Sequence, residues 1–226
     1  MHDLTPLWIS IRVAVVSTII VFILSILLAK SMYHRKQKWT HMIESIVLLP
    51  IVLPPTVLGF LLLMLFSVNG GFGHFLTDVL GVKVVFTWIG ATVASVIVSF
   101  PLMYQHVVQG FRNINPKMLN TARTMGASEL KIFFKIILPL SKRALITGTM
   151  LAFARAIGEF GATLMVAGYI PGKTNTLPLE IYFLVQQGRE NQAWLWVLVL
   201  VAFAISVIGT MTVSYTHLRA HETVLD

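Results

Sequence analysis

Long apolar stretches without charged side chains are the feature that most limits what this chain can fold into. Residues 13 to 29, for example, contain no Asp, Glu, Lys or Arg. A helix rises about 1.5 Å per residue, so about 20 such residues cross the hydrocarbon core of a bilayer, which is about 30 Å thick. An isolated segment in lipid must satisfy its own backbone hydrogen bonds, and a helix does so. The sequence therefore predicts an all-α polytopic membrane protein.

Five stretches of this kind predict five transmembrane helices, with ends defined to within a few residues. Residues 1–213 are accordingly expected to form one transmembrane domain. The loop between the second and third spans, Ser67–Asp78, is rich in glycine and is predicted to be a turn. The last thirteen residues, 214–226, change composition abruptly, and we expect a C-terminal tail that is a read-through or assembly artefact rather than native sequence. The five predicted spans cover about Ile9–Ala29, Ser45–Phe66, Phe86–Val108, Ala144–Ala167 and Ala193–Val213.

The composition agrees with a membrane protein. Of the 226 residues, 56% are hydrophobic and only 12% are charged, whereas soluble domains carry about 25% charged residues. The chain has no cysteine, which excludes disulfides and thiolate metal sites.

The distribution of Lys and Arg predicts the orientation in the membrane. Eleven basic residues lie in the loops after the first and third spans, and three lie in the opposite loops. Loops rich in Lys and Arg stay in the cytoplasm, so the N-terminus is predicted to be outside and the C-terminus inside. The net charge of +8 is then mainly a topology signal, and no nucleic-acid partner is expected. The eleven residues are Lys30, Arg35, Lys36, Lys38, Arg112, Lys117, Arg123, Lys131, Lys135, Lys142 and Arg143.

Prolines in the second span predict that its helix begins late or kinks. Proline removes a backbone donor and clashes with the preceding turn. In a membrane the freed carbonyls are tolerated where they face protein or a wet cavity. Pro54, Pro55 and Thr56 are therefore candidates for a pore-lining kink, with a simple proline-initiated helix end as the alternative.

A charged, amphipathic segment interrupts the apolar chain between the third and fourth spans. Gly126 is expected to divide it into two short helices, because glycine adopts turn conformations that a side chain disfavours. Ser128 is a suitable cap for the second helix, whose wet face would carry Lys131 and Lys135. The segment is either an amphipathic helix on the inner leaflet, attracted by anionic lipid, or a protruding helix that docks into a partner's cleft.

The spacing in this segment resembles the cytoplasmic loop of permease subunits of binding-protein-dependent ABC importers. That loop reads Glu-Ala-Ala, three residues, Gly, nine residues, Ile, one residue, Leu-Pro. Asn120 and Thr121 stand at the positions of the Glu and the first Ala, and the other positions match. The resemblance implies a coupling helix that sits in a groove of an ATP-hydrolysing subunit. The coupling residues it implies are Asn120, Thr121, Ala122, Arg123, Gly126, Ala127, Ser128, Ile136, Leu138 and Pro139.

Two further segments, Leu48–Leu63 and Phe153–Tyr182, resemble molybdate permeases, the oxyanion branch of the same family. The resemblance implies the permease subunit of an ATP-driven molybdate importer in the inner membrane. Its implied partners are a second copy of the chain, a cytoplasmic ATP-binding ABC subunit, a periplasmic or surface molybdate-binding protein, and membrane lipid. The partner subunit would use the ATP, so no cofactor bound by this chain is expected. The outer loop Gly168–Glu180 would face the binding protein or simply be solvated.

The resemblance leaves alternatives open. Sulfate/thiosulfate and tungstate permeases share much of these motifs, so a permease for one of those anions is the nearest alternative. A membrane enzyme or an uncoupled channel is the alternative from a different class.

Arg155 and Glu159 are ionisable residues inside the fourth predicted span. Residues four apart lie on one face of a helix, where opposite charges pair. Charges at this depth are costly, and they normally face a bundle interior or a water-filled path. The two residues are either a structural ion pair or, together with Gly161, part of a pore or gate for the passing anion.

The sequence offers no catalytic or metal site. It has neither an HExxH nor a GxSxG motif, and no paired intramembrane carboxylates. His41 and Glu44, three residues apart at the start of the second span, are predicted to form an interfacial pair rather than a metal site. We therefore expect a transport subunit and not an enzyme.

Overall fold

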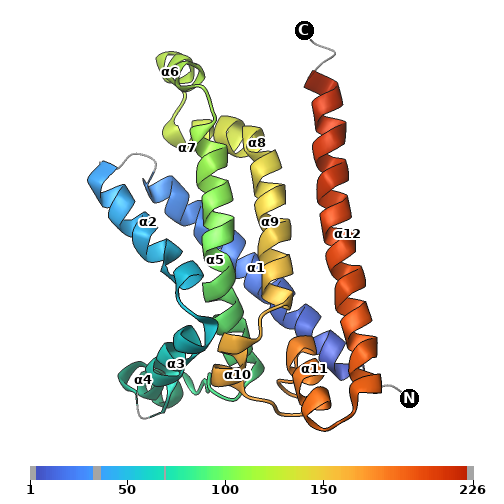
Figure 1. Cartoon of the computed structure of the whole chain (residues 1–226). Helices are drawn as coiled ribbons and strands as arrows, with labels where there is room; N and C mark the ends of the chain where they lie inside the picture. Colours follow the sequence, from blue (N-terminus) through green and yellow to red (C-terminus); the bar gives the residue numbers. More distant parts are fainter. Residues whose placement is uncertain (1–3, 33–36, 69, 223–226) are drawn as a thin grey trace.

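Three long apolar helices run through the computed structural model of this chain (Figure 1). They are α1 (Thr5–Met32), α5 (Trp88–Arg112) and α12 (Glu190–Glu222). Each contains a stretch long and apolar enough to cross a membrane, which in α12 is Glu190–Thr210. They confirm the first, third and fifth predicted spans.

The structure describes residues 4–32, 37–68 and 70–222, with the backbone alone for 37–39 and 211–222. Within these ranges all regular structure is helical, without a strand. Arg35 and Lys36 of the predicted cytoplasmic loop lie outside the described residues, as do the last four residues of the predicted tail.

The second predicted span is broken at its prolines. It consists of α2 (Gln37–Val52) and α3 (Pro55–Phe66), which meet at an angle of 111°. Pro50 lies inside α2, whereas Pro55 occupies the first turn of α3. The predicted kink is confirmed, and it lies at Leu53–Pro54, where a proline cannot continue the hydrogen bonds of the preceding helix.

The fourth predicted span is also broken, contrary to the single helix expected over Ala144–Ala167. α9 (Lys142–Ile157) ends before Gly158, and a separate short helix, α10 (Gly161–Ala167), follows. At this break the Glu159 side chain accepts a hydrogen bond from the Ala162 N–H in the first turn of α10. A periodicity argument does not detect this, because both helices are apolar.

The glycine-rich segment after α3 was expected to be a turn, and that expectation is wrong for most of it. Residues Gly71–Leu80 form α4, which ends at Gly81 in the left-handed conformation, φ +64°. Another short helix, α11 (Leu177–Gln186), lies between α10 and α12.

Helices α1, α5 and α9 pack on one another and form the centre of the molecule. Small side chains allow the close approach, as at Gly148 of α9, where a Cβ would lie 2.8 Å from the Cβ of His106 on α5. α2 packs on α5, α3 on α10, and α12 on α11 and α9. α1 begins and α12 ends at opposite ends of the molecule (Figure 1).

Candidate functional site

The charged segment between α5 and α9 protrudes at the end of the molecule where α12 ends (Figure 1). It contains α6 (Pro116–Thr124), α7 (Glu129–Ile132), a π-helical turn η1 (Phe133–Ile137) and α8 (Leu138–Leu140). We call residues 116–140 the insert. The predicted division into two helices at Gly126 is confirmed, and Gly126 has the positive φ of +80° that favours glycine.

Local hydrogen bonds cap both short helices and close the turn between them. The Asn115 side chain accepts from the Lys117 N–H (2.9 Å) and caps α6, while Pro116 fills the first helical position. Past the end of α6, the Ala127 N–H donates to the Ala122 carbonyl (3.0 Å). Ser128 caps α7, as predicted, by accepting from the Lys131 N–H (3.4 Å).

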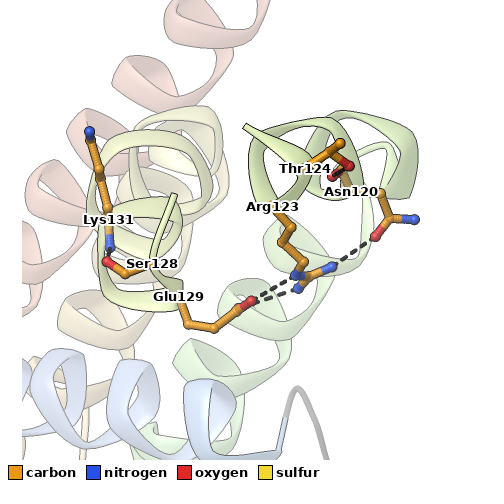
Figure 2. A network of polar contacts seen from close by, with 6 residues as sticks. All are labelled: Asn120, Arg123, Thr124, Ser128, Glu129 and Lys131. Carbon is orange, nitrogen blue, oxygen red and sulfur yellow. Dashed lines mark hydrogen bonds and ion pairs between the residues drawn. The ribbon is translucent and has the colours of Figure 1, made fainter. Parts of the chain in front are cut away.

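Arg123 connects the two short helices of the insert (Figure 2). Its Nε and Nη2 donate to the two carboxylate oxygens of Glu129, at 2.7 and 3.3 Å. Its Nη1 donates to Asn120 Oδ1 at 2.9 Å. Asn120, which stands where the importer loop has Glu, therefore still supplies an oxygen to this network. A forked guanidinium–carboxylate contact defines an angle as well as a distance, so it orients α7 relative to α6.

The apolar residues of the insert divide into two sets. Leu119, Ile132 and Phe133 are buried in a cluster with residues of α1 and α5, and so attach the insert to the membrane helices. Met118 and Met125, by contrast, are exposed, Met125 to 82%. The insert therefore presents apolar as well as charged side chains at its surface.

The insert is also attached at its exit. Lys30, at the end of α1, places its Nζ 4.4 Å from the centre of the Phe133 ring. In η1 the Leu138 N–H donates to the Phe133 carbonyl, and Pro139 has no N–H to continue the ladder. The chain then bends by 67° into α9.

Arg155 and Glu159 form the predicted pair, with 2.6 Å between Arg155 Nη1 and Glu159 Oε2. The other carboxylate oxygen of Glu159 accepts from the Ala162 N–H at 2.9 Å. The Glu159 side chain is 1% exposed, whereas that of Arg155 is 33% exposed. Glu159 therefore stabilises the start of α10, while Arg155 is the more exposed partner of the pair.

The break after α9 lies against the break after α2. A Cβ at Gly161 would be 2.8 Å from the Pro55 Cβ and 3.6 Å from the Thr56 nitrogen. Pro54 lies just before, as the residue that precedes α3. The structure thus brings Pro55, Thr56 and Gly161, three of the candidates for the pore, to one junction at which two spans are interrupted.

The loop after α10 contains buried polar residues. Thr174, Asn175 and Thr176 are buried. The Tyr169 hydroxyl and the Asn175 amide both donate to one carboxylate oxygen of Glu180, each at 3.0 Å. Burial, and then the hydrogen bond to Glu180, raise the pKa of Tyr169 to about 12. Lys173 is exposed on this loop.

Sequence reasoning missed two basic residues with specific contacts. Arg12, inside the first span, places its guanidinium carbon 3.8 Å from the centre of the Trp88 ring. Arg112 donates from Nη2 to Glu44 Oε1 at 2.6 Å, across 68 residues of sequence. The predicted proximity of His41 and Glu44 is present at 3.7 Å, and the described residues contain no cluster of side chains suited to a metal.

Apolar helices long enough to cross a membrane, two interrupted spans that meet at one junction, and a protruding amphipathic insert together define a multi-pass membrane protein. The chain belongs to the family of binding-protein-dependent transport system inner membrane components, whose family model matches residues 13–220.

Relatives and a solved structure agree with this assignment. YvgM of Bacillus subtilis (strain 168) is 41% identical over 213 residues, which are 94% of each chain. The molybdenum transport system permease protein ModB of Escherichia coli (strain K12) is 41% identical over 165 residues, 73% of this chain and 72% of that one. The crystal structure of a bacterial ABC transporter involved in import of the acidic polysaccharide alginate has a similar fold. Its TM-score is 0.76 at 17% identity, covering 94% of this chain and 79% of that chain.

Proposed function

We propose that this chain is the permease subunit of an ATP-driven molybdate importer, which forms the pathway across the inner membrane and couples to a separate ATPase subunit. The protruding insert supports this proposal most directly. It combines the Gly126 turn with an exposed face around Met125, at the end of the molecule opposite the start of α1. The names of YvgM and ModB, both molybdenum transport system permease proteins, support the choice of anion.

The insert would be the surface that contacts the ATPase. Asn120, Thr121 and Arg123 lie on its exposed side with the Gly126 turn. Ala122, Ala127 and Ile136 are half-buried against the cluster that contains Leu119, Ile132 and Phe133, so their proposed role is to hold the insert at the right angle. Leu138 and Pro139 would transmit its motion into α9. ATP would be bound and hydrolysed by the partner, and this chain would carry no cofactor and no enzymatic activity of its own.

A second copy of the chain is the proposed partner within the membrane. One bundle of this size is too small to enclose a gated path for an oxyanion. Apolar side chains of α2, among them Met42, Ile46 and Leu49, are exposed and need lipid or protein around them. The excess of basic residues on the insert side supports an N-terminus outside and a C-terminus in the cytoplasm, with a molybdate-binding protein docking at the outer end.

The interrupted junction is the proposed element of the pathway. Pro54, Pro55 and Thr56 would line it from one span, and Arg155, Glu159 and Gly161 from the other. Because Arg155 is the more exposed member of its pair, its guanidinium is the group proposed to attract the anion. Binding of ATP would close the two ATPase subunits, draw the inserts together and open the path outward, and hydrolysis would reset it. This is alternating access between two states that the ligands favour differently.

The experiment is the ATPase activity of the complex purified with its native partners and reconstituted into vesicles. Molybdate, tungstate and sulfate are each added with the cognate binding protein. Stimulation by molybdate and not by sulfate is the expected result. Stimulation by sulfate instead would mean that the transported anion is sulfate, with the proposed mechanism unchanged. If no ATPase co-purifies with the chain, the assignment as an importer subunit is wrong, and a membrane enzyme or an uncoupled channel replaces it.

A further inference from the structure

The ion pair between Glu44 and Arg112 belongs neither to the insert nor to the interrupted junction. It joins α2, which leads to the junction, with the end of α5, which leads to the insert. Glu44 belongs to α2, the first half of the broken second span. Arg112 is the last residue of α5, four residues before the insert begins at Pro116. Unlike His74–Asp78 and Arg155–Glu159, whose members are four residues apart, this pair joins two different spans.

The attachment of α2 to the rest of the chain is narrow. None of its side chains from Thr40 to Val52 is fully buried. Val47 packs against the cluster that contains Val107 and Phe111 of α5, and Glu44 lies one turn away on the same face. The Glu44 side chain is 19% exposed, so it is partly removed from water at the point where α2 meets α5. The ion pair is therefore a specific polar contact between α2 and the end of α5.

Arg112 is also firmly linked to the insert. The Asn113 N–H donates to the Gln109 carbonyl at 3.1 Å, and the Ile114 N–H to the Phe111 carbonyl at 3.4 Å. Ile114 is buried, and Asn115 caps α6. The connection has little freedom, so a movement of the insert carries the end of α5 with it.

The far end of α2 leads directly to the interrupted junction. After the bend of 111°, Pro55 of α3 touches Gly161, two residues past Glu159. Held at Arg112, α2 therefore connects the insert with the residues proposed to line the pathway.

We infer that Glu44 is a positioning residue, whose ion pair with Arg112 makes α2 move together with the end of α5 and so passes movement of the insert to the junction at Pro55 and Gly161. This inference rests on the proposed function, since it needs a coupled importer. The Arg112 side chain is 59% exposed, and an ion pair open to water contributes little to stability. The expected consequence of losing it is thus poorer coupling with a nearly unchanged fold.

The test is a double-mutant cycle in the reconstituted complex, with ATP hydrolysed per anion taken up as the readout. Glu44→Gln, Arg112→Gln and the double variant are compared with the unmodified chain. Each single variant is expected to raise this ratio by at least about fivefold, the lower end of usual coupling effects, and the double variant to raise it no further. The reversed pair, Glu44→Arg with Arg112→Glu, is expected to restore much of the coupling.

His41 provides a matched control, because it approaches the same carboxylate at 3.7 Å but belongs to α2 itself. His41→Gln is expected to leave the ratio unchanged. Single variants with the normal ratio, or effects that multiply in the double variant, would overturn the inference. If the variant with the reversed pair does not assemble into a complex, the cycle of Glu44→Gln, Arg112→Gln and the double variant still tests the inference. An unmodified complex without anion-stimulated ATPase would instead refute the proposed function.

Discussion

Gly161 and Pro55 are in direct contact: a Cβ built on Gly161 would lie 2.8 Å from the Cβ of Pro55. These residues begin α10 and α3, the second halves of two interrupted spans. The proline ring cannot rotate away, so the contact leaves no room for a side chain. The two breaks can therefore lie this close together only because Gly161 has no Cβ.

Gly161→Ala is expected to destabilise the protein by about 1–3 kcal/mol, because the added methyl group overpacks a site that cannot relax. Thermal unfolding of the purified complex measures this. Gly209 of α12 is a matched control, since a Cβ there meets no atom within 4 Å. Gly209→Ala is expected to be neutral or stabilising by about 0.5–1 kcal/mol. Equal effects of the two substitutions would contradict the close contact.

Gly126→Asp is expected to leave the protein folded and inserted in the membrane but to abolish the proposed transport-coupled ATPase activity. A side chain at Gly126 meets open space, and Asp tolerates its positive φ better than most residues. The effect should therefore come from a charge placed on the docking surface. ATPase stimulation and co-purification of the partner measure it. Gly126→Asn has the same shape without the charge and should keep most of the activity; normal uptake by the Asp variant would refute the docking role.

Neutralising Arg155 and Glu159 separates the two interpretations of this pair. Arg155→Gln alone leaves the buried Glu159 carboxylate without its cation and should destabilise the protein by about 1–3 kcal/mol. Arg155→Gln with Glu159→Gln should regain most of that stability, because the glutamine still offers an oxygen to the Ala162 N–H. If Arg155 attracts the anion, uptake of radiolabelled molybdate stays low in the double variant. Recovery of both uptake and stability would mean that the pair is purely structural.

Tyr169 should ionise only near pH 12 in the folded protein, whereas an unfolded tyrosine ionises near pH 10. Since the folded pKa is the higher one, its contribution to stability is fully present below about pH 10 and is lost as the pH rises through about 12. The tyrosinate absorbance of the protein minus that of Tyr169→Phe reports this ionisation. Glu180→Gln removes the acceptor charge and should lower the pKa of Tyr169. Ionisation of Tyr169 near pH 10 in the folded chain would contradict the buried contact.

The sequence alone predicted those features that depend on neighbouring residues. The apolar stretches defined where the chain crosses a membrane, because each helix must satisfy its own hydrogen bonds there. The turn at Gly126 and the cap at Ser128 are local geometry, and both are confirmed. The pairing of Arg155 with Glu159 needed only a spacing of four residues.

Only the tertiary structure decided which of these residues meet across the chain. Hydrophobic periodicity could not tell that Phe133 is buried while Met125 is exposed, since both are apolar residues of one amphipathic segment. Nor could it place Glu44 beside Arg112, or Pro55 against Gly161. Contacts between distant positions depend on how whole helices pack and where each one breaks. That packing reflects the volumes and charges of several elements at once, whereas a sequence pattern reports only one element at a time.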